Sequence, residues 1–410
     1  MRGQNKNALF SGLFFFMVLF SLFVMRPFRS AVAAQIGTAD LTFFLFLVVL
    51  VMLFANFIYS AVLSRIKESR LVLYIYGFFI LNLVVFAYLN FYYESNYALG
   101  ATFYVWYNIF NFFVVSIFWA KTVNCFDRAE GNKFFGIISA FGSAGAFIGS
   151  RTVSAYLTDA PVMAITLSLA ALMLAIFFSS KLKPTNITKI EKKDISIDLV
   201  DQINQVKNNT LVQKLLTYAF IWTCCSTALY FFSLEIINKY TNDIVEQRAI
   251  FADADSLVTP ITFFSQILIT RFLLESRFFG LRFVLGIYGV FFIIAYLMMA
   301  GHFADFLFTG TGVLLFLIIS ALMRPFEYAI NKPARETVYT TLKKSEKYRS
   351  TVFIDTFINR FGDASGGLLF NILLTLGLAL AVAPLAILPL ALILSGFGVN
   401  ISKSVKEVKS

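Results

Sequence analysis

Charged side chains gather in residues 323–367 of a chain that is otherwise strongly apolar. A charge at bilayer depth costs about 3 kcal/mol or more, so such residues are expected to face a partner, a cavity or a transport pathway. The alternative is that they only pair with one another and hold helices together. The residues at or just past the end of one apolar run, or inside the next, are Arg324, Glu327, Arg335, Glu336, Asp355, Arg360 and Asp363.

Asp355 and Asp363 belong to a regular pattern of polar residues. Asp355, Asn359 and Asp363 recur every four residues, so in a helix they share one face, with Arg360 beside them. We predict a salt-bridge gate here that breaks and reforms between the inward-open and outward-open states of a transporter, with Glu327 as a further gating residue.

A second pair of cations lies near the N-terminus. Arg26 and Arg29 are three residues apart, so they share a helix face if the first apolar helix continues past Pro27. Two guanidinium groups on one face suit a phosphate or carboxylate, because each offers a planar fork of donors. The alternative is ordinary anchoring, with both side chains reaching the outer membrane surface.

Two polar residues inside apolar runs are further candidates for substrate binding. Glu235 could balance a cation, bind a coupling proton or pair with one of the two arginines, or it could simply reach water at a helix end. Asn108 follows Trp106 and Tyr107, so it could hydrogen-bond a planar ligand that stacks on a ring. Hydrogen bonding between helices is the simpler explanation for Asn108.

The composition predicts helices that cross a membrane. The chain is 59% hydrophobic and 14% charged, with a mean hydropathy of +0.78. Runs of about 20 apolar residues span a bilayer as helices, which satisfy their own backbone hydrogen bonds. The first run is kept as a span, since no small-residue cleavage site precedes Arg26. We predict an all-α membrane protein with twelve spans near 8–26, 41–64, 71–91, 99–124, 134–157, 161–181, 211–237, 254–275, 281–300, 306–329, 350–376 and 379–401.

The positions of lysine and arginine predict the topology. A polar connection at 182–210 separates an N-terminal half, 1–181, from a C-terminal half, 211–410, each with six spans. If both termini are cytoplasmic, 26 of the 34 basic residues lie inside, and the outer segments hold only four: Arg26, Arg29, Lys239 and Arg248. The net charge of +11 therefore indicates membrane topology rather than nucleic-acid binding.

Similar glycine motifs recur in the two halves. Gly145 and Gly149 in the fifth span, and Gly362 and Gly366 in the eleventh, each have the GxxxG spacing that lets helices approach closely. They could form a rocking contact between the halves or serve plain close packing. Twelve spans in two related halves predict the major facilitator architecture, which places a substrate site between the halves.

No pattern typical of catalysis is present in the sequence. It has no Gly-rich phosphate loop followed by Lys and Ser or Thr, no nucleophile elbow and no metal-ligand spacing among its three cysteines and single histidine. We therefore expect a protein that is not an enzyme, with no cofactor and no metal, and transport driven by exchange or an ion gradient.

One stretch resembles a known family. Lys332-Pro333-Ala334-Arg335-Glu336-Thr337-Val338-Tyr339 is similar to the Pro-x-Lys-Glu-x-x-Tyr pattern of the ATP/ADP translocases, a family of nucleotide transporters with a major-facilitator-like fold. A basic connection and Ile354-Asp355 follow, leading to a Gly-rich helix, and Val105 to Asp127 resembles the family's fourth helix. The resemblance implies nucleotide transport governed by cations in helix 1 and after helix 10, and by carboxylates in helices 4 and 7.

The resemblance also assigns residues. It places Arg29 and Arg335 at two lysines of the family, and Glu235 at its helix-7 glutamate. Asn108 takes the place of the helix-4 glutamate, so one carboxylate of the family is neutral here. These positions, with Arg26, form the predicted substrate site.

We therefore predict a monomeric secondary transporter in a bacterial inner membrane, with both termini cytoplasmic. It would carry a small organic anion, first of all a nucleotide or another phosphorylated metabolite. The alternative is a proton-coupled exporter of another solute, such as a siderophore or a drug, whose cavity some of the 50 phenylalanines would line. A membrane sensor that transports nothing is a third hypothesis.

Overall fold

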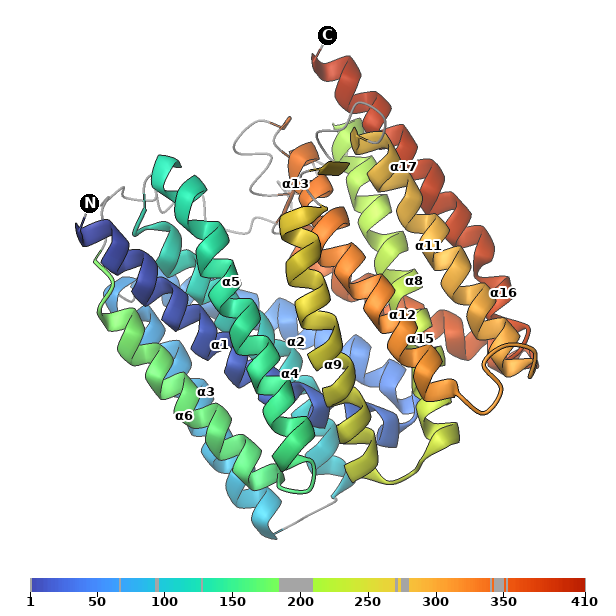
Figure 1. The fold of residues 1–410 in the computed structure, drawn as a ribbon, viewed down its shortest axis with the longest axis horizontal. Coiled ribbons are helices and arrows are strands. Elements are labelled where there is room, and N and C mark those ends of the chain that lie inside the picture. Colours follow the sequence, from blue (N-terminus) through green and yellow to red (C-terminus); the bar gives the residue numbers. More distant parts are fainter. Residues whose placement is uncertain are drawn as a thin grey trace. The chain divides into compact units, whose positions relative to one another are not determined.

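The computed structural model describes residues 2–65, 68–92, 96–126, 128–183, 209–269, 272–273, 280–339, 341–342, 350–351 and 353–409. Most of the predicted linker, 184–208, lies outside these ranges. The described residues form helices joined by short connections (Figure 1). The secondary structure is therefore all-α, as predicted.

The N-terminal helices are α1 (Arg2–Ile36), α2 (Thr38–Arg65), α3 (Glu68–Tyr92), α4 (Tyr97–Val123), α5 (Arg128–Thr152) with a π-helical segment (Val153–Leu157), and α6 (Pro161–Ser180). The C-terminal helices are α8 (Thr210–Tyr240), α9 (Ile244–Leu268), α11 (Gly280–Phe303), α12 (Gly312–Phe326), α13 (Lys332–Tyr339), α15 (Asn359–Thr375), α16 (Ala383–Ala386) and α17 (Leu388–Lys409). Two more π-helical segments, Glu327–Asn331 and Ile354–Ile358, join α12 to α13 and lead into α15.

Ten helical stretches within the described residues are long and apolar enough to cross a membrane. The two remaining predicted spans, 254–275 and 350–376, fall largely on α9 and α15, which are helices but are not among the ten. Both helices carry charged residues: Asp255 lies near the middle of α9, and Asp363 lies in the second turn of α15. The count of twelve apolar spans is therefore not confirmed.

The first helix is longer than the sequence indicated. The predicted span ended at residue 26, but α1 continues through Pro27 to Ile36. A proline has no N–H to donate to the carbonyl four residues back, a loss that membrane helices tolerate. Arg26 and Arg29 therefore lie inside a helix, on one face of it, rather than in a connection.

The contacts divide the chain into two compact units. Unit 1 comprises residues 1–36, 55–195 and 242–260, and unit 2 comprises 37–54, 196–241 and 261–410. The first half of α2 thus groups with unit 2, and most of α9 groups with unit 1. Apart from these two exchanged segments, the units follow the N-terminal and C-terminal halves of the sequence.

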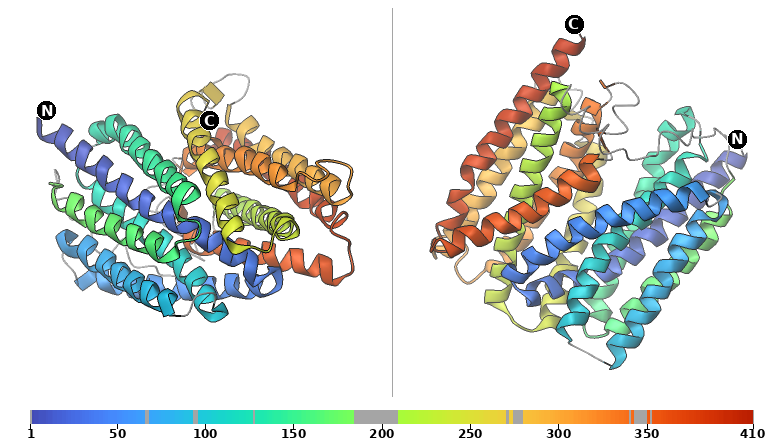
Figure 2. Two further views of the ribbon diagram at one scale, coloured as in Figure 1. Left: turned by 60° about the horizontal axis from the view of Figure 1, so that its bottom comes forward. Right: turned by 180° about the vertical axis from the view of Figure 1, so that it is seen from behind.

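The two units repeat the same set of helix pairings. In unit 1, α1 packs against α4, α5 and α6, and α3 packs against α4 and α6 (Figures 1 and 2). In unit 2, α8 packs against α12, α15 and α17, and α11 packs against α12 and α17. The helices α1, α3, α4, α5 and α6 therefore correspond to α8, α11, α12, α15 and α17.

The glycine motifs explain the closest of these pairings. A Cβ atom on Gly145 would overlap the carbonyl oxygen of Phe16 on α1, and one on Gly149 would lie 2.8 Å from the Phe20 carbonyl. In unit 2, a Cβ atom on Gly366 would overlap the Cys224 carbonyl on α8. The structure therefore shows one role for these glycine motifs: they allow α5 to pack closely on α1 and α15 to pack closely on α8.

Candidate functional site

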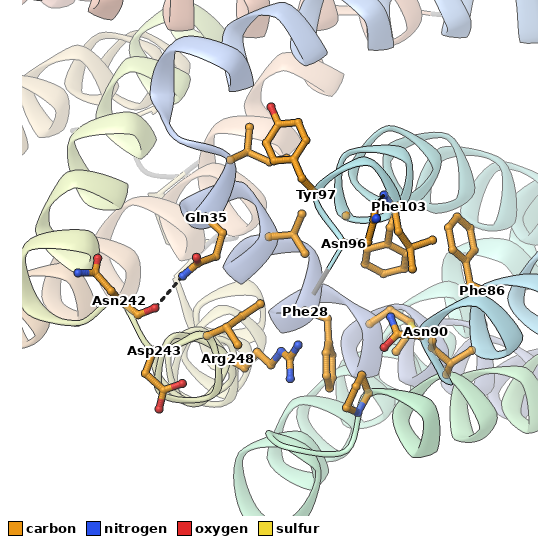
Figure 3. A pocket seen from close by; sticks show the side chains of 18 residues that line it. Phe28, Gln35, Phe86, Asn90, Asn96, Tyr97, Phe103, Asn242, Asp243 and Arg248 are labelled. Atoms are coloured by element: carbon orange, nitrogen blue, oxygen red, sulfur yellow. Dashed lines mark hydrogen bonds between the residues drawn. The ribbon is translucent and has the colours of Figure 1, made fainter. Parts of the chain in front are cut away.

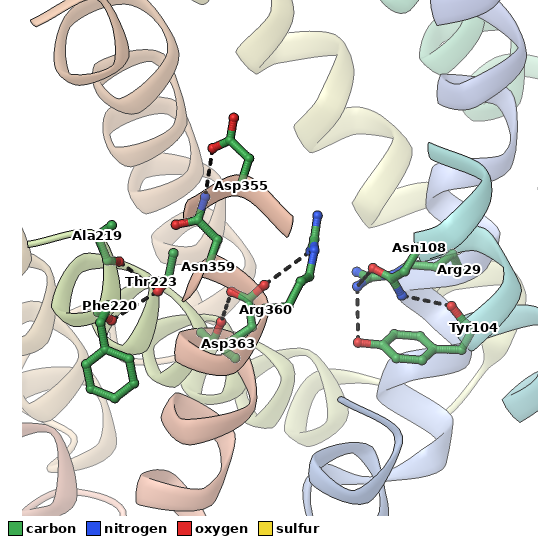
Figure 4. A network of polar contacts seen from close by, with 11 residues as sticks. Arg29, Tyr104, Asn108, Ala219, Phe220, Thr223, Asp355, Asn359, Arg360 and Asp363 are labelled. Atoms are coloured by element: carbon green, nitrogen blue, oxygen red, sulfur yellow. Dashed lines mark hydrogen bonds and ion pairs between the residues drawn. The ribbon is translucent and has the colours of Figure 1, made fainter. Parts of the chain in front are cut away.

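Arg29 lies against α4 in unit 1. Its Nη2 donates to the hydroxyl of Tyr104 (3.1 Å) and to Oδ1 of Asn108 (3.4 Å), and its guanidinium carbon lies 4.5 Å from the centroid of the Tyr104 ring. Asn108 is one turn after Tyr104, and its Nδ2 donates to the Tyr104 carbonyl (2.8 Å), which turns Oδ1 toward the arginine (Figure 4). Two predicted site residues, Arg29 and Asn108, are thus in contact, together with a tyrosine that was not predicted.

Arg26, one turn earlier on α1, lies against α9. Its Nε is 3.6 Å from Oδ2 of Asp255, whose residue is only 3% exposed, and its guanidinium lies over the Phe23 ring. A buried carboxylate is costly unless it is paired. Asp255 was missed, although two carboxylates, Asp253 and Asp255, beside an apolar run were a visible signal.

Arg335 lies in a buried polar network in unit 2. Its Nη2 donates to Oε1 of Glu327 at 2.5 Å, each residue is 7% exposed, and its guanidinium lies over the Trp222 ring at 4.9 Å. Asn331 donates to the other oxygen of Glu327 (2.6 Å), and the hydroxyl of Tyr218 lies 2.8 Å from Oδ1 of Asn331. A predicted substrate residue and a predicted gating residue therefore form one ion pair.

The charged face of α15 is present, but its members form two separate pairs. Arg360 donates to Oδ2 of Asp363 at 3.2 Å, and Thr227 on α8 donates to Oδ1 of Asp363 at 2.8 Å (Figure 4). Asn359 donates to Asp355 at 3.2 Å. Because the side chains of Arg360 and Asp363 remain about a quarter exposed, this pair is the more accessible of the two ion pairs that the structure describes in unit 2.

Glu235 is half-buried on α8 and accepts a hydrogen bond from Oγ1 of Thr38 at 3.2 Å. Thr38 is the first residue of α2, and its carbonyl accepts from Nδ2 of Asn371 on α15, which also donates to Oγ1 of Thr42. These bonds explain why the start of α2 belongs to unit 2.

Among the described residues, no group of three or more His, Cys, Asp or Glu side chains could hold a metal ion. The three cysteines, Cys125, Cys224 and Cys225, are buried and form no disulfide. The charged clusters described above consist of arginine paired with carboxylate, amide or aromatic groups.

Known structures share the fold along the whole chain. The crystal structure of the nucleoside transporter NupG has a TM-score of 0.60 at 13% identity, with all of both chains covered. The structure of a bacterial homolog of the human lysosomal transporter Spinster has a TM-score of 0.60 at 9% identity, with 99% of this chain and 98% of that chain covered. No protein-family model and no curated protein sequence matches the chain.

The chain therefore has a major-facilitator-type fold, shared with these two structures, and the structure describes ten helical stretches that are long and apolar enough to cross a membrane. At such low identity, the likeness concerns the fold. The membership in the ATP/ADP translocase family and the roles of the site residues remain predictions.

Proposed function

We propose that the chain is a secondary active transporter that moves a small organic anion by alternating access, most directly a nucleotide or another phosphorylated metabolite in exchange for a second anion. The observation that carries the proposal is the cluster of Arg29, Tyr104 and Asn108. At about 1.5 Å per residue, Arg29 lies about 13 Å from the middle of the span 5–36, within half of a hydrocarbon core about 30 Å thick.

The chemistry of this cluster matches the phosphate of a nucleotide. A guanidinium binds a phosphate through two parallel hydrogen bonds. Tyr104 is fully buried and Asn108 is 8% exposed, so in the proposal both hold the guanidinium in place, and Arg29, which is half-buried, meets the phosphate. A cation held among such groups inside a membrane helix is more typical of a ligand site than of a surface anchor.

The other charged groups receive distinct roles in the proposal. Arg335 would reach the anion only by exchanging Glu327 for a phosphate oxygen, so substrate and carboxylate would compete for it. The more exposed Arg360–Asp363 pair, with Asp355 nearby, would open and close as a gate. Glu235 would set selectivity, and Arg26 would keep Asp255 neutralised beside the site.

The proposal retains the predicted arrangement in the membrane. It includes twelve crossings, with α9 and α15 completing the ten apolar spans, and a monomer in a bacterial inner membrane with both termini cytoplasmic. The bias of lysine and arginine toward one side supports this orientation.

The test is uptake of labelled nucleotides into proteoliposomes that are preloaded with unlabelled nucleotide. Loss of a charge-assisted hydrogen bond costs about 2–3 kcal/mol, so Arg29→Ala should weaken uptake roughly 30- to 150-fold, and Arg29→Lys less. The control is Arg151→Gln, since Arg151 is an exposed arginine of the same unit (60% of its side chain). Full activity after charge removal at both Arg29 and Arg335 would overturn the proposal.

The same assay separates the alternatives. A nucleoside has the base and ribose but no phosphate, and one structure with this fold is a nucleoside transporter. Uptake of nucleosides that is insensitive to Arg29→Ala would identify a neutral substrate. Transport that ignores both arginines but requires a proton gradient would favour the exporter of another solute.

A further inference from the structure

A cavity of about 450 Å³ lies within unit 1, where five helices begin or end. It is found at the C-terminal ends of α1 and α3 and the N-terminal ends of α4, α6 and α9 (Figure 3). Polar side chains share its wall with aromatic rings. The polar lining comprises Gln35, Asn90, Asn96, Asn242, Asp243 and Arg248.

Arg248 supplies a fixed positive charge to this cavity. The sequence placed Arg248 in an outer connection, but it lies in the first turns of α9. Its Nη1 donates to the Thr158 carbonyl at 2.9 Å, and its guanidinium carbon lies 4.8 Å from the centroid of the Phe28 ring. Among the described residues of the lining, Asp243 is the one carboxylate, and its Oδ1 accepts from the backbone N–H of Val245 at 3.0 Å.

An apolar groove of about 660 Å³ adjoins the cavity along α3 and α4. Phe86, Asn96 and Leu99 line both spaces, so the two lie next to each other. Phe78 and Leu81, which line the groove, are 59% and 63% exposed. From Phe78 to Leu89 the groove follows α3 for about 16 Å, close to the thickness of one leaflet of the hydrocarbon core, about 15 Å.

We propose that the cavity and the groove together hold one anionic membrane phospholipid. Helix ends place the polar cavity at the level of lipid headgroups, and the groove runs from there into the hydrocarbon region. Arg248 pairs with the phosphate. The amide oxygen of Asn96 accepts from the N–H of Leu99 (3.1 Å), which turns its amide nitrogen to a headgroup oxygen, and one acyl chain lies between α3 and α4.

The positive charge of Arg248 in the cavity and the apolar shape of the groove together favour an anionic phospholipid as the occupant. A free phosphate compound would fill the cavity but leave the exposed apolar wall of the groove uncovered. A zwitterionic lipid would fill both spaces but bring its own cation close to Arg248. An anionic phospholipid matches the single guanidinium and the apolar groove at once.

The test is native mass spectrometry of the full chain, purified in detergent, stripped of lipid and then incubated with phosphatidylglycerol, phosphatidylcholine or glycerol 3-phosphate. We expect one tightly held phosphatidylglycerol per chain, and about tenfold less phosphatidylcholine. Arg248→Gln should lower the retention of phosphatidylglycerol about tenfold, to the level of phosphatidylcholine. Ala98→Trp, which fills the groove, should abolish retention of both lipids.

Matched controls make the result decisive. Met173→Trp introduces the same side chain on α6, at an exposed position outside the groove, and should retain the lipid. Melting temperatures without lipid confirm that each variant folds, and Val85→Trp replaces Ala98→Trp if the latter does not. Equal retention by all variants, or glycerol 3-phosphate competing as well as the whole lipid, would overturn the proposal.

Discussion

The two units share one set of helix pairings but differ in the surroundings of one arginine in each, Arg29 in unit 1 and Arg335 in unit 2. In unit 1, Arg29 lies on the ring of Tyr104 and donates to neutral acceptors of α4. In unit 2, Arg335 lies against the carboxylate of Glu327, in the continuation of α12, the helix that corresponds to α4. The described contacts of Arg29 thus include an aromatic face and neutral acceptors, whereas those of Arg335 include a buried counter-charge.

Removing one member of the buried pair should have the largest effect. Arg335→Ala leaves Glu327 as a buried carboxylate without its cation, and breaking a buried pair in this way costs about 3–5 kcal/mol. The measurement is the unfolding midpoint in detergent. The double variant Glu327→Leu with Arg335→Met should recover most of the loss, because no buried charge remains. A single variant as stable as the wild type would contradict this account of unit 2.

Removing the charge of Arg29 in unit 1 should lower the affinity for the ligand more than it lowers the stability of the fold. Arg29→Ala removes the hydrogen bonds to the neutral side chains of Tyr104 and Asn108, so we expect a stability loss of about 1–2 kcal/mol, smaller than that of Arg335→Ala. If the proposed site is correct, nucleotide binding measured by thermal shift should weaken roughly 30-fold or more. A stability loss as large as that of Arg335→Ala would show that both arginines are structural and would erase the difference between the units.

The glycine contacts test the similarity of the units. Gly145→Ala and Gly366→Ala each force a methyl group against a carbonyl oxygen of the neighbouring helix, and overpacking costs about 1–3 kcal/mol. The two losses in stability should be similar. Gly136→Ala is the control, since nothing lies within 4 Å of its Cβ position. A loss at only one of the two sites would show that the repeated pairing is tight in one unit only.

The Arg360–Asp363 pair should contribute least to stability. Its side chains are about a quarter exposed, and such pairs are worth up to about 1 kcal/mol. Arg360→Gln and Asp363→Asn should therefore shift the unfolding midpoint only slightly while changing the rate of exchange in proteoliposomes. Unchanged rates for both variants would remove the gate from the proposed mechanism.

The sequence predicted what depends on local pattern. Apolar runs of bilayer length located the helices, and a four-residue spacing placed Asp355, Asn359 and Asp363 on one face, where Asn359 does bond to Asp355. The spacing of Arg26 and Arg29 placed them correctly on one face of the first helix. These features follow from helical geometry alone.

The sequence could not predict what depends on contacts between distant segments. Asp255 is 229 residues from Arg26, and no periodicity links the two. The continuation of α1 past Pro27 depends on packing that outweighs the lost hydrogen bond. The unit 1 cavity is formed by the ends of five helices, so no single stretch of sequence marks it.

The π-helical segments have a consequence for how the chain tolerates length changes. A π turn closes over five residues instead of four, so it equals an α turn with one residue inserted. Deleting one residue from Glu327–Asn331 would return that turn to an α turn and leave α13 in register, whereas a deletion inside α8 would rotate the rest of that helix by about 100°. Deletions of one residue should therefore be accepted at these segments more readily than inside a regular helix. Each of the last two segments carries a charged residue of the proposed mechanism, Glu327 or Asp355.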